Sequence, residues 1–204
     1  MFYLRKNQIE AAMIVISSHI DRVTQEYNLT LDRGVHGGLL DNQIGVLLSY
    51  LAIYDDSNLL RLEQAGKIKV WHSRGEEWGM LYDPPKQIGK EDLVIVVDVS
   101  SGKRYNGYDF HVTNISGVPD KKIKEIAENM EWEGFKVKWK KYTGAEEDED
   151  ESWSWVNLGI PVMSFEIPIE DPPECRWHTE KCKVTVEKIL RCRHGLKRLI
   201  AYAL

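Results

Sequence analysis

Short apolar runs alternate with amphipathic stretches along the chain. Each run is rich in β-branched residues and has the length of a strand that is buried on both faces, as in a parallel sheet. The four runs are residues 11–18 (AAMIVISS), 67–72 (KIKVWH), 93–99 (LVIVVDV) and 161–167 (PVMSFEI). We therefore predict four strands at these positions.

Three segments repeat apolar residues with the helical period of 3.6. We predict that the first helix begins near Asp41 and that the second follows Asp120, which we expect to be its N-cap; the third is C-terminal. Their apolar stripes are Ile44, Leu47, Leu48 and Leu51; Ile123, Ile126 and Met130; and Val186, Ile189, Leu190, Leu196, Leu199 and Ile200. Strands that alternate with helices predict an α/β layered domain with a largely parallel sheet.

Composition narrows the class of protein. A chain of 204 residues, 43% of them hydrophobic, is long enough for one domain with its own core, and the absence of a repeat or a Pro/Gly/Ser linker favours a single domain over residues 1–204. The 27 basic and 32 acidic residues give a net charge of −5 without a basic block, so we expect no nucleic-acid partner.

Membrane association and export are not expected either. The longest apolar runs fall well short of the roughly 18 residues that span a bilayer, and the first residues, MFYLRKNQIE, lack the apolar core of a signal peptide. The three cysteines, Cys175, Cys182 and Cys192, show no CxxC spacing. This pattern fits a reducing compartment, and we expect a cytoplasmic protein.

Polar residues able to bind a metal follow the predicted strands. In doubly wound sheets, ligands gather at the carboxyl ends of the strands. Imidazole and carboxylate groups suit Zn²⁺, Co²⁺ or Mn²⁺, whereas Mg²⁺ and Ca²⁺ prefer oxygen alone. These residues are His19 and Asp21, Asp41 at the start of the first helix, Glu76 and Glu77, Asp98, and His178.

Each of these features has an ordinary structural interpretation when taken alone. A His-x-Asp pair can arise by chance, a double Glu is usually solvated, and Asp41 has the place of an N-cap. Asp98 is more informative, because a carboxylate at the end of VIVV must be paired, ligated or exposed. The stronger indication is that four separate elements place donors at one edge of one sheet.

The order and spacing of these motifs resemble the co-catalytic di-zinc exopeptidase superfamily, which includes leucyl and glutamyl aminopeptidases and related acylases and deacetylases. The resemblance extends over residues 10–200. It implies a three-layer α/β/α sandwich with a mixed, largely parallel central sheet. The motifs that carry it are SSHID, LLDNQIG, HSRGEEWG, VIVVDVS, WSWVNLGIPV and RWHTE.

The resemblance also implies a role for each residue. His19 matches the first ligand, and Asp41 matches the carboxylate that bridges two zinc ions. Glu77 and His178 would complete one zinc site, and Asp98 would complete the other with His19. The two remaining carboxylates match non-ligand positions: Glu76 that of the general base, and Asp21 that of the carboxylate supporting the site beside the first histidine.

The chemistry explains these residue types. Two neighbouring cations need a shared anion to offset their repulsion, and they lower the pKa of a water bound between them toward ~7. A carboxylate that is not a ligand can then carry the proton to the leaving amine. The function implied by the resemblance is hydrolysis of N-terminal residues from peptides by a di-zinc aminopeptidase, with Co²⁺ or Mn²⁺ as alternative metals.

The chain also departs from the resembled family. It is shorter than members that carry a lid domain, Cys182 stands where an acidic residue is common, and Glu151-Ser152 stands where Asp-His is common. Two alternatives therefore stay open: a deacylase or carboxypeptidase with the same metal site, acting on acylated amino acids, and a non-catalytic relative. A domain without a lid can close its cleft by forming a homo-oligomer.

Other aromatic and imidazole side chains have mainly structural interpretations. His72 lies within a predicted strand, which favours a core or edge position, and His194 lies on the last helix, where we expect it at the surface. His111 has no partner in the motif pattern. Trp155 is most simply a core or cleft-wall residue, and Trp177, next to His178, is our candidate for a wall of the substrate pocket.

Overall fold

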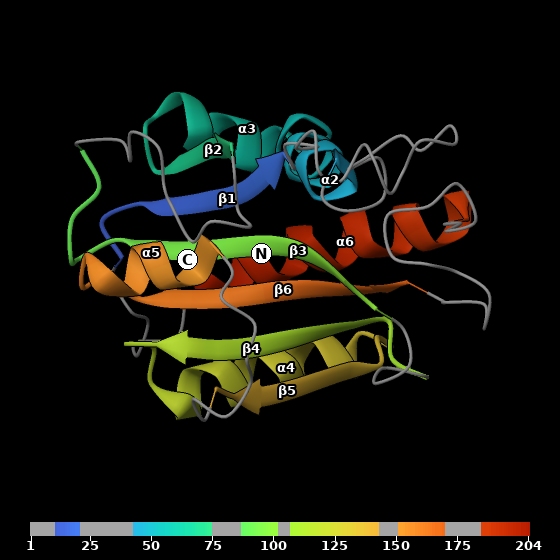
Figure 1. The fold of residues 1–204 in the computed structure, drawn as a ribbon. Coiled ribbons are helices and arrows are strands. Elements are labelled where there is room, and N and C mark those ends of the chain that lie inside the picture. Colours follow the sequence, from blue (N-terminus) through green and yellow to red (C-terminus); the bar gives the residue numbers. More distant parts are fainter. Residues whose placement is uncertain (1–10, 21–42, 75–86, 102–106, 143–150, 170–184) are drawn as a thin grey trace, which may run out of the picture.

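The computed structural model describes residues 11–20, 43–74, 87–101, 107–142, 151–169 and 185–204 (Figure 1). Six strands form one mixed sheet in the order β2-β1-β3-β6-β4-β5. The strands are β1 (Ile14–Ile20), β2 (Ile68–Arg74), β3 (Leu93–Ser101), β4 (Phe110–Ser116), β5 (Val137–Lys141) and β6 (Val162–Ile169). Neighbouring strands run parallel except β4 and β6, which are antiparallel.

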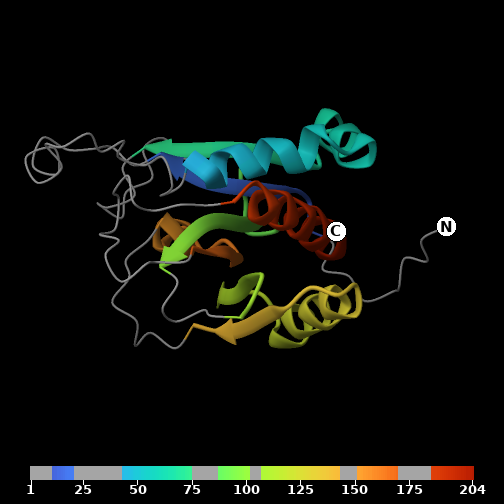
Figure 2. The ribbon, with the colours of Figure 1, turned by 90° about the vertical axis from the view of Figure 1, so that its right-hand side faces the viewer.

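Helices cover both faces of this sheet (Figures 1 and 2). The helices are α2 (Gln43–Tyr54), α3 (Ser57–Gln64), α4 (Asp120–Trp132), α5 (Glu151–Asn157) and α6 (Val186–Ala203). One apolar cluster joins α2, α3, α4 and α6 to one face, and a smaller cluster joins α5 to the other. We call the second face of the sheet the α5 face. The predicted α/β fold with a mixed, mostly parallel sheet is confirmed.

The central strands are buried on both faces, as their continuous apolar runs predict. In β1, Ile14 and Ile16 join the larger cluster while Val15 joins the smaller one. β3 alternates in the same way: Val94 and Val96 lie in the smaller cluster, on the α5 face. All five of these side chains are at most 1% exposed.

Two predicted apolar stripes are partly wrong. In α2, Leu47 is 46% exposed, because Ile44 and Leu48 pack together with Ala52 and turn Leu47 outward. In α6, Val186 and Leu190 are exposed, since successive residues rotate by about 100° and these two lie about 100–140° from the centre of the buried face. That face consists of Cys192, Gly195, Leu196, Leu199, Ile200 and Ala203.

The predicted N-cap of the second helix is also wrong. Pro119 is the N-cap residue of α4, without a side-chain cap, and Asp120 is already the first helical residue. The Asp120 carboxylate instead accepts hydrogen bonds from Asn114 Nδ2 at 2.7 Å and Lys141 Nζ at 2.9 Å. These bonds join the start of α4 to the ends of β4 and β5.

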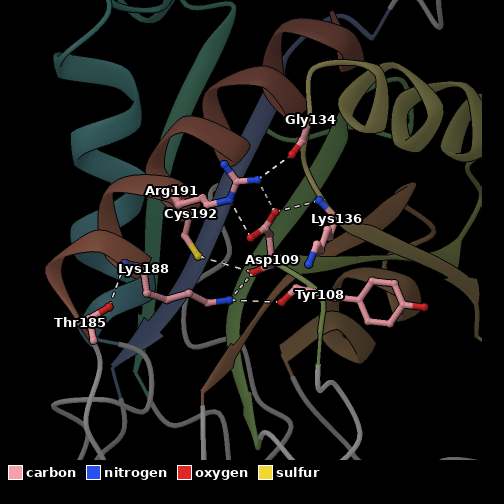
Figure 3. Close-up of polar contacts among 8 residues, drawn as sticks. All are labelled: Tyr108, Asp109, Gly134, Lys136, Thr185, Lys188, Arg191 and Cys192. Carbon is pink, nitrogen blue, oxygen red and sulfur yellow. Dashed lines mark hydrogen bonds and ion pairs between the residues drawn. The ribbon is translucent and has the colours of Figure 1, made fainter.

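Asp109, the residue before β4, connects that strand to α6 and β5 (Figure 3). Its carboxylate accepts hydrogen bonds from the Lys136 backbone N–H at 2.8 Å and from Arg191 Nη2 at 2.7 Å. Its carbonyl accepts one from Lys188 Nζ at 2.7 Å. Burial raises the pKa of the Asp109 carboxyl, but the hydrogen bonds from Arg191 and Lys136 outweigh it and hold the pKa below its ordinary value.

We expect Asp109→Asn to lower the free energy of unfolding at pH 7 by about 1 kcal/mol. Because the folded-state pKa of Asp109 is lowered, its contribution is present above the unfolded value of about 3.9 and is lost as the pH falls through the folded value. Urea unfolding at pH 7, 4 and 3 should show the difference between wild type and variant shrinking toward low pH. A difference that stays constant across this range would contradict the assignment.

Candidate functional site

Four parallel strands end at one edge of the sheet, which we call the carboxyl edge. β2, β1, β3 and β6 are neighbours in this order, and each runs in the same direction as the next. β4 runs the opposite way, so its first residues lie beside the last residues of β6. The carboxyl edge is the part of a parallel sheet where ligand-binding residues usually gather.

Two predicted metal ligands belong to adjacent strands at this edge. His19 is the last residue but one of β1, and Asp98 lies in β3. β1 and β3 are paired in parallel with Ser17 opposite Val96. This is the last pair of the two strands, and His19 and Asp98 each follow two residues after it, at the carboxyl ends of neighbouring strands. The Asp98 side chain is half-buried.

The other five predicted site residues lie outside the described residues. These residues are Asp21, Asp41, Glu76, Glu77 and His178. Trp177, our candidate for a pocket wall, lies outside them as well. Among the residues that the structure describes, no three His, Cys, Asp or Glu side chains form a group that could hold a metal ion. The seven-residue assignment therefore stays a prediction.

Imidazole and carboxylate donors at His19 and Asp98 suit zinc chemically. Asp98 ends the apolar series Val94, Val96 on the α5 face, at the point where the strand passes from buried to half-buried. A half-buried carboxylate in that place can serve as a ligand without the cost of complete burial. The part of the donor set that is described thus fits the predicted metal.

A polar cluster beside Asp98 was missed in the sequence. Glu166 lies opposite Asp98 in the parallel pairing of β3 and β6. Its Oε1 atom accepts hydrogen bonds from Thr113 Oγ1 at 2.6 Å and from Ser164 Oγ at 2.8 Å. Lys140 Nζ lies 3.9 Å from Glu166 Oε2. The sequence does contain one indication of this cluster. Polar Ser164 and Glu166 alternate with Met163 and Phe165, which places the two polar side chains on the same face of the strand.

His111, for which the motif pattern offered no role, is buried in β4 opposite Glu166. Burial lowers the pKa of its imidazole to about 3, with further lowering by the charges of Lys138, Lys140 and Lys188. The ring is therefore neutral at pH 7 and adds no positive charge beside Glu166. Its ring also makes an edge contact with Tyr108, with 5.6 Å between the centroids.

The structural interpretations of three other residues are confirmed. His72 lies on the edge strand β2, where its Nδ1 atom is 2.8 Å from Ser18 Oγ in a hydrogen bond across to β1. His194 is exposed on α6. Trp155 is fully buried and donates a hydrogen bond to Ser17 Oγ at 3.2 Å.

A hollow of about 490 Å³ is lined by neither Asp98 nor Glu166. It is bordered by Gly107, Tyr108, Glu131, Phe135, Lys136 and Val137. Phe135 and Val137 belong to the cluster on the α4 and α6 side of the sheet. We therefore base the candidate site on the carboxyl edge and the α5 face, where Asp98 and Glu166 lie, rather than on this hollow.

Comparison with known proteins gives distant structural matches. No protein-family model matches the sequence, and no curated protein matches it. A structure described as a "putative peptidase/endoglucanase" is 16% identical with a TM-score of 0.47, over 81% of this chain and 50% of the other. The chain thus covers half of that protein's length.

Two further matches have similar scores. The catalytic domain of CwlV, an N-acetylmuramoyl-L-alanine amidase from Bacillus (Paenibacillus) polymyxa var. colistinus, is 10% identical with a TM-score of 0.47, over 93% of this chain and 96% of the other. A metallo-carboxypeptidase from Burkholderia cenocepacia is 11% identical with a TM-score of 0.45, over 93% and 56%. At these values no site residue or activity is transferred to this chain.

The helices were also compared with the length of a membrane span. In the described ranges, none is at once long enough and apolar enough to cross a bilayer.

Proposed function

We propose that this protein is a metal-dependent hydrolase that removes N-terminal residues from peptides, with two zinc ions bound at the carboxyl edge. The observation that carries the proposal is the pairing of β1 with β3. His19 and Asp98 stand 79 positions apart in the sequence, and each follows two residues after Ser17 and Val96, the last pair between these adjacent parallel strands. The motif order and spacing described above support the rest of the ligand set.

In this proposal each residue of the chain has a distinct task. His19, Asp41, Glu77, Asp98 and His178 would hold the metal, with Asp41 shared between the two ions. When bound, zinc supplies Lewis acidity toward the peptide carbonyl and activates a water molecule. Glu76 would accept the proton of the attacking water and deliver it to the leaving amine. Asp21 would orient His19.

The first test is metal content. We expect wild-type protein purified with zinc to contain two ions per chain and to hydrolyse leucyl p-nitroanilide. A chelator should abolish the activity, and Zn²⁺, Co²⁺ or Mn²⁺ should restore it. Asp98→Asn keeps the size of the side chain but removes its charge, and it should lower the zinc content to one ion. Glu128→Gln, at an exposed position on α4, is the matched control. A wild type that takes up no zinc would refute the proposal.

The predicted metal ligands are common to the aminopeptidase and to the deacylase or carboxypeptidase alternative, so they cannot distinguish these activities. Substrates with a free or an acylated α-amine can separate the aminopeptidase from the alternative. Hydrolysis should require a free α-amine if the enzyme is an aminopeptidase. Turnover of N-acetylated amino acids, without turnover of the free-amine substrate, would instead identify a deacylase. The same assay with both substrates therefore distinguishes an aminopeptidase from a deacylase.

A further inference from the structure

The carboxylate of Glu166 is held in a fixed orientation. Two hydroxyl groups, Thr113 Oγ1 and Ser164 Oγ, donate to the same oxygen, Oε1, at 2.6 and 2.8 Å. An ionised carboxylate has two oxygens and about four acceptor sites, so these bonds leave Oε2 available for other donors. The Glu166 side chain is 13% exposed, which restricts its movement further.

Among the described residues, Lys140 is the cation within ion-pair distance of Glu166. Its Nζ atom lies 3.9 Å from Oε2, which is beyond hydrogen-bond distance. Lys140 therefore offsets part of the charge of Glu166 without donating a hydrogen bond to Oε2. An additional N–H donor can bind this oxygen while the two hydroxyl groups hold the other.

Glu166 and Asp98 lie beside each other on the same face of the sheet. They are opposite each other in the parallel pairing of β3 and β6, where neighbouring strands are about 5 Å apart. Strand side chains alternate between faces. Asp98 therefore shares the α5 face with Val94 and Val96, and Glu166 shares it with Val162. A group bound at Glu166 would lie next to a group bound at Asp98.

Two carboxylates and two lysines of β5 meet around this part of the sheet, because Lys138 and Lys140 lie opposite His111 and Thr113. Asp98 and Glu166 are adjacent carboxylates, and like charges at this distance repel each other. The imidazole of His111, whose pKa is lowered by burial and by the neighbouring lysines, adds no positive charge beside Glu166, so the printed ion pair of Glu166 is the one with Lys140. Lys138, on the outer strand β5, places its Nζ atom 5.8 Å from the centre of the Tyr108 ring.

We propose that Glu166 is a specificity-determining residue that binds the α-ammonium group of the peptide substrate through Oε2. This inference rests on the proposed function, because it places the first carbonyl of the substrate at the metal held by Asp98. In a peptide, one carbon atom separates the α-amine from the first carbonyl. The two groups are therefore close enough to bind at Glu166 and at the metal held by Asp98, which lie on adjacent strands. The preferred substrates are thus peptides with a free N-terminus.

Glu166→Gln tests the inference by removing the charge while keeping the size of the side chain. We expect KM for leucyl p-nitroanilide to rise about 10- to 100-fold, as for the loss of a charge-assisted hydrogen bond. The value of kcat and the zinc content should change little. Ser164→Ala, which keeps the carboxylate and removes one of its two hydroxyl donors, should raise KM less. Glu128→Gln should leave KM unchanged.

Calorimetric binding of L-leucinamide and N-acetyl-L-leucinamide tests the inference without turnover. Wild-type protein should bind the free amine more tightly than the acetylated form, and Glu166→Gln should abolish this preference. Equal binding of both compounds to wild type, or an unchanged preference in the variant, would overturn the inference. A loss of zinc from Glu166→Gln would also overturn it, because Glu166 would then be a metal ligand.

The two proposals can fail separately in these experiments. If wild type takes up zinc and hydrolyses the substrate while Glu166→Gln keeps the wild-type KM, the role of Glu166 is wrong and the proposed function stands. If wild type binds no zinc and hydrolyses neither substrate, the proposed function is wrong. Circular dichroism of each variant shows that it is folded before these comparisons are made.

Discussion

Replacing Glu76 with Gln is expected to lower kcat about 10²- to 10⁴-fold while the protein keeps its zinc, because the side chain is assigned to proton transfer and not to metal binding. The measurement is hydrolysis of leucyl p-nitroanilide together with the zinc content per chain. Glutamine has almost the same size as glutamate but cannot accept the proton from the attacking water.

The neighbouring residue is the matched control for this prediction. Glu77→Gln changes the same group one position along the chain, but it should lose bound zinc because Glu77 is assigned as a ligand. The pair therefore separates a base from a ligand at adjacent positions. If Glu76→Gln keeps full activity, or if it loses zinc as Glu77→Gln does, the division of roles between the two glutamates is wrong.

Trp155→Ala is expected to lower the free energy of unfolding by about 3–5 kcal/mol. Trp155 is fully buried between α5 and the sheet, donates to Ser17 Oγ and makes an edge contact with Trp71, with 5.3 Å between the centroids. It anchors α5 to the face that carries Asp98 and Glu166. Urea unfolding followed by circular dichroism measures the change without relying on tryptophan fluorescence.

Trp132 provides the control for this substitution. It lies at the end of α4 and is 92% exposed, so Trp132→Ala should change the free energy of unfolding by less than about 0.5 kcal/mol. Trp155→Phe, which keeps an aromatic ring but loses the hydrogen bond to Ser17, should fall between the two. Equal effects of Trp155→Ala and Trp132→Ala would show that α5 is not anchored by this ring.

The parts of the fold that the sequence predicts correctly are those with a strong local pattern. The four apolar runs became β1, β2, β3 and β6. β1, β3 and β6 lie inside the sheet and must be apolar on both faces, whereas β2 forms one edge of the sheet. β5 was missed because three of its five residues are lysines, and only pairing with β4 at the sheet edge explains it. β4 was missed because buried polar residues, His111, Thr113 and Asn114, interrupt its apolar pattern.

The candidate site shows a similar division. Composition and motif order indicate a metal-binding chemistry. They do not contain the pairing that makes β1 and β3 neighbours, or the register that brings Glu166 opposite Asp98. The register between two strands depends on how the strands pack against each other, and the sequence of one strand alone does not specify it. The sequence alone therefore predicts only that Glu166 belongs to a strand, whereas its two hydroxyl partners come from two different strands.

The position of β6 has a consequence for how the chain folds. Among the described residues, β6 is the last strand along the chain, yet it lies between β3 and β4, and Val162 is paired with Val94. The units β2-β1-β3 and β4-β5 therefore cannot join into one sheet until β6 has been synthesised. On the ribosome, both units would expose unpaired strand edges up to that point, so this protein should fold late in synthesis and any chain ending before β6 should be prone to aggregation.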